Sequence, residues 1–194
     1  MTKRAIPILP TLVVAAAIAV MIRLGFWQLD RADEKEALIA RAQQAARMSS
    51  EVRYRTPIRE DDELLYRRTS VNCTDILERN AVAGTSERGA KGWAQRVTCA
   101  LESGDEAVVD IGFAREPKLV DWTGGEVRGT IAPGGRIVAA TPIAGLEPLA
   151  RPDPRDLPNN HLAYVGQWFL FALTALVIYI LALRRRRRTP ASRG

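Results

Sequence analysis

The sequence of 194 residues contains one histidine and two cysteines, and this scarcity excludes several kinds of site. A single histidine, His161, cannot build a multi-histidine metal centre. Cys73 and Cys99 have neither Cys-x-x-Cys spacing nor a nearby histidine, which disfavours a copper site. The Gly-x-Ser-x-Gly motif and the phosphate-binding loop are also absent. We therefore expect a protein that is not an enzyme and has no catalytic residues.

Acidic residues are missing from both ends of the chain. All 22 of them lie between Asp30 and Asp156, and residues 30–160 carry a net charge of −3, with 19 basic residues. The other nine basic residues lie in the two ends and produce the overall net charge of +6. A basic nucleic-acid-binding domain is disfavoured by this distribution.

Each end contains an apolar segment long enough to cross a membrane. Residues 6–29 are interrupted only by Arg23, and residues 161–183 contain no Lys, Arg, Asp or Glu. At 1.5 Å per residue, both reach the roughly 30 Å of a bilayer core. A cleaved signal peptide is the alternative for the first segment, because Lys3 and Arg4 precede it. No small-x-small cleavage site follows the apolar run, so we expect an uncleaved anchor.

The basic flanks predict the orientation. Lys3, Arg4 and the run Arg184–Arg188 favour the cytoplasmic side, so residues 1–5 and 184–194 are expected there. Residues 30–160 are then expected to form a domain on the opposite, periplasmic side. No transit peptide precedes the first span, which favours a bacterial plasma membrane. An anionic-lipid or nucleic-acid ligand is the less favoured interpretation of the arginine run.

The domain between the spans begins with a helix and continues with strands. Residues 33–48 are rich in helix formers and predict a helical stalk that continues from the first span. Residues 66–140 contain short strand-like runs between turn signals. The expected strands are Tyr66–Cys73, Leu77–Ala83, Gly92–Leu101, Ala107–Phe113, Glu126–Ala132 and Arg136–Ala140. The predicted fold class is a membrane α+β protein, in which two transmembrane helices flank a small antiparallel sheet or open barrel.

Cys73 and Cys99 lie on two different predicted strands. In an oxidising compartment, a disulfide is the expected state of such a pair. Two free buried thiols are the alternative.

The environment of His161 suggests a cofactor. Tyr164 and Trp168 follow at i+3 and i+7 and share its helix face. The first span presents Trp27 at the same level, with Arg23 and Arg31 one turn away on either side. An imidazole beside aromatic rings can bind haem iron, and arginines can pair with haem propionates. The alternative is an interfacial cap residue within an aromatic belt.

Several segments resemble the surfeit-locus protein family, the assembly factors of cytochrome c oxidase. Leu24–Arg31 with Lys35 resembles that family's Leu-Gly-x-Trp-Gln-Leu-x-Arg segment. Asn160–Tyr164 with Gln167–Phe169 resembles the motif at its second span. Tyr66–Arg68 and Gly89–Trp93 are similar to a strand and a turn of the family. Val109–Ala114 departs from its Val-x-Arg-Gly-Trp-Val-Pro strand, with Asp110 and Phe113 in comparable places. The Cys73 and Cys99 pair is not part of the family pattern.

The resemblance implies a non-catalytic assembly factor that helps deliver haem a to the catalytic subunit of a haem–copper oxidase. His161 matches the family's proposed haem ligand. The implied partners are that subunit, the haem a synthesis machinery and the lipid bilayer, with no nucleic acid. A homo-oligomer or a partner's histidine would fill the second axial position, and a five-coordinate haem would leave it empty. A scaffold without haem contact is the alternative, and a periplasmic-ligand sensor is disfavoured because the cytoplasmic ends are short.

Overall fold

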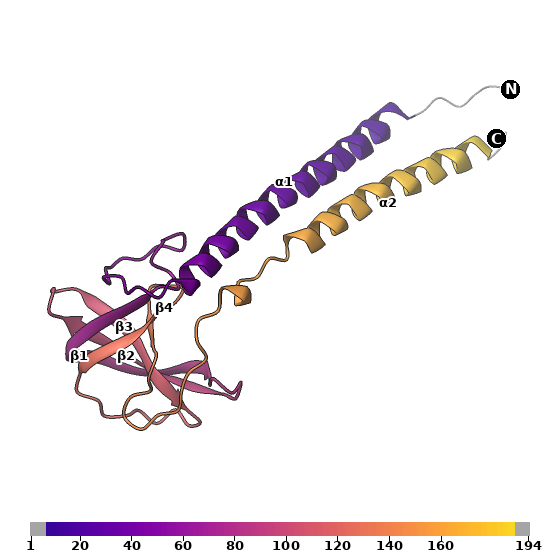
Figure 1. Cartoon of the computed structure of the whole chain (residues 1–194). Helices are drawn as coiled ribbons and strands as arrows, with labels where there is room; N and C mark the ends of the chain where they lie inside the picture. The colour runs from indigo at the N-terminus through magenta and orange to yellow at the C-terminus, as the bar shows by residue number, and fades with distance from the viewer. Residues whose placement is uncertain (1–6, 189–194) are drawn as a thin grey trace. The chain divides into compact units, whose positions relative to one another are not determined.

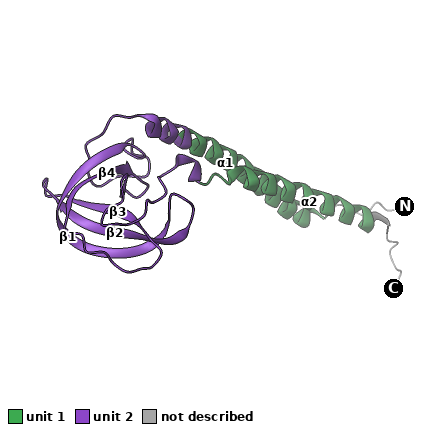
Figure 2. Ribbon diagram, turned by 60° about the horizontal axis from the view of Figure 1, so that its bottom comes forward, with its two compact units in different colours: residues 1–37, 158–194 green, residues 38–157 purple. Residues whose placement is uncertain are grey.

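The computed structural model describes residues 7–188, which divide into two compact units. Figure 2 colours the units separately. One comprises the chain up to Ala37 together with the chain from Pro158 onward, and the other runs from Leu38 to Leu157. The expected cytoplasmic residues 1–5 and the basic tail beyond Arg188 lie outside the described residues. Both apolar segments thus belong to the first unit, and all the strands belong to the second.

Two long helices account for the apolar segments. α1 spans Ile8–Arg47 and α2 spans His161–Arg188, and each contains a stretch long and apolar enough to cross a membrane. In Figure 1 they lie side by side and antiparallel within the first unit. α1 runs through the expected stalk without a break, because its second half has no Gly or Pro. The part of α1 up to Ala37 and all of α2 are called the helix pair below.

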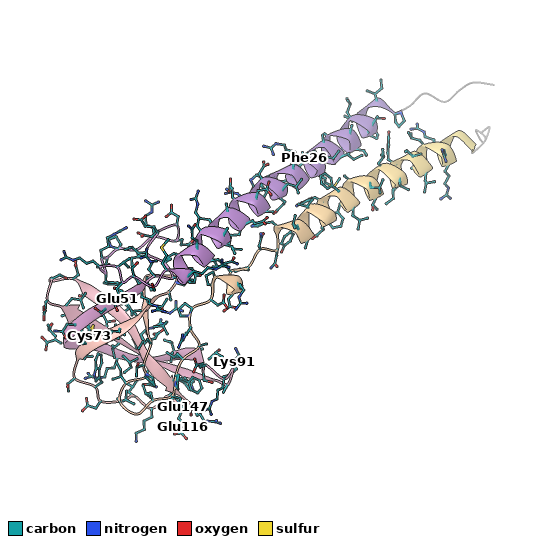
Figure 3. All side chains as sticks on the ribbon, in the orientation of Figure 1. Phe26, Glu51, Cys73, Lys91, Glu116 and Glu147 are labelled. Atoms are coloured by element: carbon teal, nitrogen blue, oxygen red, sulfur yellow. A yellow bond between two sulfur atoms is a disulfide. The ribbon has the colours of Figure 1, made fainter. Side chains whose placement is uncertain are left out.

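The helix pair is held by small residues, aromatic rings and polar contacts. Partly or fully buried positions of α1 recur every three or four residues, as a helix–helix seam requires. They include Thr11, Val14, Ile18, Met21, Gly25, Gln28 and Ala32. A Cβ at Gly25 would come within 2.9 Å of the Phe169 ring, which also packs edge-on against Phe26. Figure 3 labels Phe26 on α1. The hydroxyls of Thr11 and Tyr179 share a hydrogen bond. Contacts of these kinds drive helix association in lipid.

The second unit is built on five strands that close into a barrel in the order β1-β2-β3-β5-β4. The strands are β1 Arg68–Thr85, β2 Lys91–Leu101, β3 Glu106–Ala114, β4 Gly125–Ile131 and β5 Ile137–Ala139. Figure 1 shows β1 to β4 wrapping around a common core. A short 3₁₀ helix at Pro154–Asp156 follows the barrel. Together with the two long helices, the barrel confirms the predicted membrane α+β class.

The barrel differs from the sequence prediction in detail. The expected strands 66–73 and 77–83 are parts of one strand, β1, which bends at register shifts beside Cys73 and Ile76 instead of turning. The barrel is closed, and β3 pairs with β5 in parallel through Val109–Ile137 and Asp110–Val138. The parallel pair follows from the number of strands, because an odd number cannot close with every neighbour antiparallel.

Glycine allows the last two strands to fit. Gly134 and Gly135 form the turn between β4 and β5 with φ values of 82° and 76°, which side chains disfavour. On β4, a Cβ at Gly129 would collide with the carbonyl oxygen of Val138. The close approach of β4 and β5 therefore depends on a residue without a side chain at this position.

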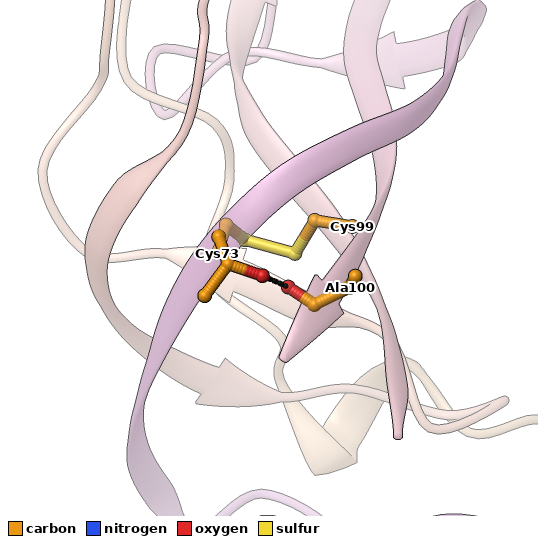
Figure 4. The surroundings of a disulfide bond; sticks show 4 residues. Cys73, Cys99 and Ala100 are labelled. Carbon is orange, nitrogen blue, oxygen red and sulfur yellow. Dashed lines mark hydrogen bonds between the residues drawn. A yellow bond between two sulfur atoms is a disulfide. The ribbon is translucent and has the colours of Figure 1, made fainter. Parts of the chain in front are cut away.

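Cys73 of β1 and Cys99 of β2 form a disulfide inside the barrel (Figure 4). Both cysteines are almost fully buried. They belong to an apolar core that also contains Val71, Val97, Ala107, Val109, Ile111, Val127 and Ile137. Beside the bond, the Thr74 hydroxyl donates a hydrogen bond to the Ala100 carbonyl at 3.1 Å. The pairing of the two cysteines thus joins neighbouring strands at the centre of the core.

Asp110 of β3 is a buried carboxylate held by two arginines. It accepts hydrogen bonds from Arg96 Nε at 2.6 Å, Arg96 Nη2 at 3.1 Å and Arg136 Nε at 3.0 Å. Its hydrogen bonds raise the pKa of the Arg96 guanidinium. Arg136 also donates to the Pro133 carbonyl. The cluster therefore ties β2, β3 and the turn before β5 together.

Replacing Asp110 with asparagine should lower the free energy of unfolding by about 2 kcal/mol, because hydrogen bonds to a buried charge are lost. Arg96 and Arg136 are 29% and 35% exposed, so water will compensate part of this loss. Urea unfolding of the full chain in detergent, followed by tryptophan fluorescence, measures the change. Asp121→Asn, at a side chain that is 92% exposed, is the control. Equal losses in the two variants would contradict a structural role for Asp110.

Candidate functional site on the helix pair

His161 is the first residue of α2. The Asn160 carbonyl accepts hydrogen bonds from the amides of Ala163 at 3.1 Å and Tyr164 at 3.5 Å, which begins the helix. Pro158 precedes this turn and cannot donate a backbone hydrogen bond. The local sequence therefore places the imidazole on the first turn of an apolar helix.

The His161 ring contacts α1 through one polar side chain. Its Nδ1 atom lies 2.7 Å from Oε1 of Gln28, and both residues are half-buried. One turn further along α1, the carbonyl of Ala32 accepts a hydrogen bond from Nδ2 of Asn159 at 3.3 Å. Two polar contacts thus fasten the beginning of α2 to α1.

Two contacts between α1 and α2 show where His161 lies along the helix axes. The Thr11–Tyr179 and Gln28–His161 contacts are 17 residues apart on α1 and 18 apart on α2. This separation is about 26 Å of helix, slightly less than the roughly 30 Å of a bilayer core. His161 therefore lies close to one boundary of the apolar span, where a polar ring is tolerated.

Trp27 and Arg31 form a separate group on the exposed face of α1. The Arg31 guanidinium lies 5.7 Å from the Trp27 ring centre, and its Nη1 atom lies 2.6 Å from the Glu34 carboxylate. Trp27 and Gln28 are consecutive, so their side chains point about 100° apart around the helix axis. Arg23, one turn before Trp27, is also exposed. Trp27 therefore does not point into the contact between His161 and Gln28, and within residues 7–188 none of these three side chains hydrogen-bonds to either residue.

Tyr164 and Trp168 follow His161 on α2. Tyr164 is 50% exposed, and Trp168 is partly buried and packs edge-to-face on Phe171, with the ring centres 6.2 Å apart. Within residues 7–188, neither side chain hydrogen-bonds to the imidazole. They provide aromatic surface on the same helix rather than direct partners for the ring.

Gln28 and Asn159 are the residues of this site that the sequence prediction missed. Gln28 lies within the segment Leu24–Arg31, and Asn159 directly precedes Asn160–Tyr164. Neither side chain is charged or a common metal ligand. The available signal was the spacing of Gln28 from Gly25 and Ala32, since a polar residue on the buried seam of an apolar helix needs a partner.

The available donor atoms fit a single axial ligand of a haem. In the part of the chain that the structure describes, no three His, Cys, Asp or Glu side chains converge on a metal position. The cysteine sulfurs are bonded to one another, so His161 is the donor that remains among the histidine and cysteine side chains. Haem binding also requires apolar and aromatic surface for the macrocycle, and the exposed rings of Trp27 and Tyr164 offer it.

A protein-family model matches most of the chain. The model of the SURF1 family matches residues 15–173. This range contains most of the helix pair and the whole barrel. No curated protein matches the chain.

Proposed function

Because this chain belongs to the SURF1 family, which is known for cytochrome oxidase assembly, we propose that it is a non-catalytic factor that helps deliver haem a to the oxidase. The recipient would be the catalytic subunit of a haem–copper oxidase. One observation carries the proposal. His161, the chain's only histidine, begins α2 and contacts Gln28 of α1, and each of these helices is long and apolar enough to cross a membrane.

The proposed location is the bacterial inner membrane, with both termini in the cytoplasm and the barrel in the periplasm. Lys3, Arg4 and Arg184–Arg188 support this orientation, since basic flanks remain cytoplasmic. A disulfide in the barrel agrees with an oxidising compartment. His161 then lies at the periplasmic boundary of the bilayer.

Haem a would be cargo in this protein. His161 would supply an imidazole nitrogen to the iron, and Tyr164, Trp168 and Trp27 would offer aromatic surface to the macrocycle. Arg23 and Arg31 are the cations for the propionates, although Arg31 is already paired with Glu34. One imidazole per chain leaves the second axial position to a second copy, to a partner or to no ligand at all.

The proposed partners follow from a transfer role. The haem a synthesis machinery would supply the cargo, and the oxidase catalytic subunit would receive it. The apolar faces of α1 and α2 expose large side chains along their length, as a surface facing lipid or another membrane helix does. No reaction is assigned to this chain.

Deletion of the gene tests the proposal. Under haem delivery, the remaining oxidase should contain less haem a per catalytic subunit, measured by pyridine haemochrome spectra and immunoblotting of the purified complex. Complementation with the wild-type gene is the control. A scaffold without haem contact predicts fewer complexes with a normal haem a content, and that result would contradict delivery.

A further inference from the structure

The contact between His161 and Gln28 bears on the tautomer of the ring, because the role of each ring nitrogen depends on which of them carries the hydrogen. The atom of Gln28 that faces the ring is its amide oxygen, 2.7 Å from Nδ1. A carbonyl oxygen accepts hydrogen bonds and cannot donate them. With the amide in this orientation, Nδ1 carries the hydrogen, whereas a reversed amide would donate its NH₂ group to an unprotonated Nδ1.

A neutral imidazole carries hydrogen on only one of its two nitrogens, so the lone pair of the other nitrogen is available to a metal ion. With the hydrogen on Nδ1, the lone pair lies on Nε2, the atom at the far end of the ring. We infer that Gln28 is the positioning residue of His161: it holds the Nδ1–H tautomer and leaves Nε2 ready to bind iron. The assignment of iron as the ligand rests on the proposed function, whereas the assignment of the tautomer does not.

The surroundings of Gln28 keep its amide in place. It lies on the seam of α1 between Gly25 and Ala32, which are both buried. Gly25 lets α2 approach closely through Phe169, and the Ala32 carbonyl holds Asn159, two residues before His161. An amide at the edge of an apolar span is costly without a partner, which favours the hydrogen bond to the ring. Partners of this kind in metal sites orient the ligand ring and fix its tautomer.

The tautomer can be measured directly because the chain contains one histidine. Full-length protein labelled with ¹⁵N-histidine in detergent gives one pair of ring nitrogen signals. At alkaline pH, where an imidazole is neutral, the nitrogen that carries hydrogen resonates far from the one that does not. We expect Nδ1 to be the protonated nitrogen in the haem-free protein. A protonated Nε2, or averaging between the two forms, would overturn the inference.

Two substitutions separate positioning from folding. Gln28→Leu removes the acceptor and should release the ring to a mixture of tautomers. Gln28→Glu keeps an acceptor oxygen at the same distance along the side chain and should keep the Nδ1–H form. Gln44→Leu, at an exposed position of the same helix, is the matched control and should leave the spectrum unchanged. An unchanged tautomer in Gln28→Leu would overturn the role of Gln28.

Haem titration completes the test. Loss of a partner that orients a metal ligand weakens binding by about tenfold or more, so Gln28→Leu should show such a rise in the Kd for haem. Gln28→Glu and Gln44→Leu should bind as the wild type does. Equal haem affinity in wild type and Gln28→Leu would overturn the positioning role. A wild type with the Nδ1–H tautomer and no haem affinity would contradict the proposed function and support the tautomer assignment.

Discussion

Replacement of His161 with alanine is expected to abolish the Soret band of the protein purified from cells that make haem a. His161 is the only histidine of the chain, and both cysteines are bonded to each other, so no equivalent donor remains. The Kd for added haem should rise by at least about a hundredfold, the upper range for changes around a metal ligand. Absorption spectra and haem titration of detergent-solubilised protein measure both effects.

The control for this experiment is an alanine substitution elsewhere on α2. Leu173 is 57% exposed on the same helix, and Leu173→Ala should keep the band. Both variants should remain in the membrane fraction, because each leaves the apolar length of α2 intact. A Soret band of wild-type position and intensity in His161→Ala would remove this residue from the proposal.

Loss of the disulfide is expected to destabilise the barrel by about 3 kcal/mol, from the entropy of closing a loop in the unfolded chain. Cys73 and Cys99 are 26 residues apart, which sets the size of the loop. The double substitution Cys73→Ser and Cys99→Ser should therefore shift urea unfolding of the full chain to clearly lower concentrations. Tryptophan fluorescence follows the transition, since Trp93 and Trp122 lie in the second unit.

Wild-type protein unfolded in the presence of a reductant provides the comparison. It should lose most of the same stability, while the double serine variant should not respond to the reductant. Thiol titration of the denatured, unreduced wild type should detect no free thiol. Two free thiols, or a serine variant as stable as the oxidised wild type, would show that the bond contributes nothing to the barrel.

The long helices are predictable from the sequence because their determinants are local. Residues 6–29 and 161–183 are apolar over the thickness of a bilayer, and the stalk at 33–48 is rich in good helix formers and has no Gly or Pro. In the structure, α1 runs from Ile8 to Arg47 and α2 from His161 to Arg188. The resemblance to the surfeit-locus family rested on motifs at the two ends, and the family match over residues 15–173 confirms it.

The barrel is predictable only in part, because its closure depends on pairings between distant residues. Strand-like runs and turn glycines locate most strands, but a pause such as Thr74–Ile76 can be a bend within one strand or a turn between two. The sequence likewise contains no local sign that β5, with three residues, inserts between β3 and β4. Strand count and closure together then require the parallel pair.

The candidate site is likewise predictable from the sequence only in part. Helix spacing predicts that Trp27 and His161 lie near one level, yet it does not say which way Trp27 points relative to α2. The ring partner is its neighbour Gln28, because Gln28 lies on the seam with Gly25 and Ala32. Which side chains of α1 face α2 becomes known only when the two helices are placed against each other.

The two polar contacts between α1 and α2 also restrict how far one helix can slide along the other. A displacement by one turn, about 5.4 Å, would separate Thr11 from Tyr179 and Gln28 from His161 simultaneously. Gln28, His161 and Tyr179 would then lose these hydrogen bonds, which is unfavourable in or near an apolar span, whereas the Thr11 hydroxyl would keep its bond to the Pro7 carbonyl. The vertical alignment of the helices is consequently locked at both ends. We therefore expect the imidazole to keep its place along the helix pair unless both helices move as one piece.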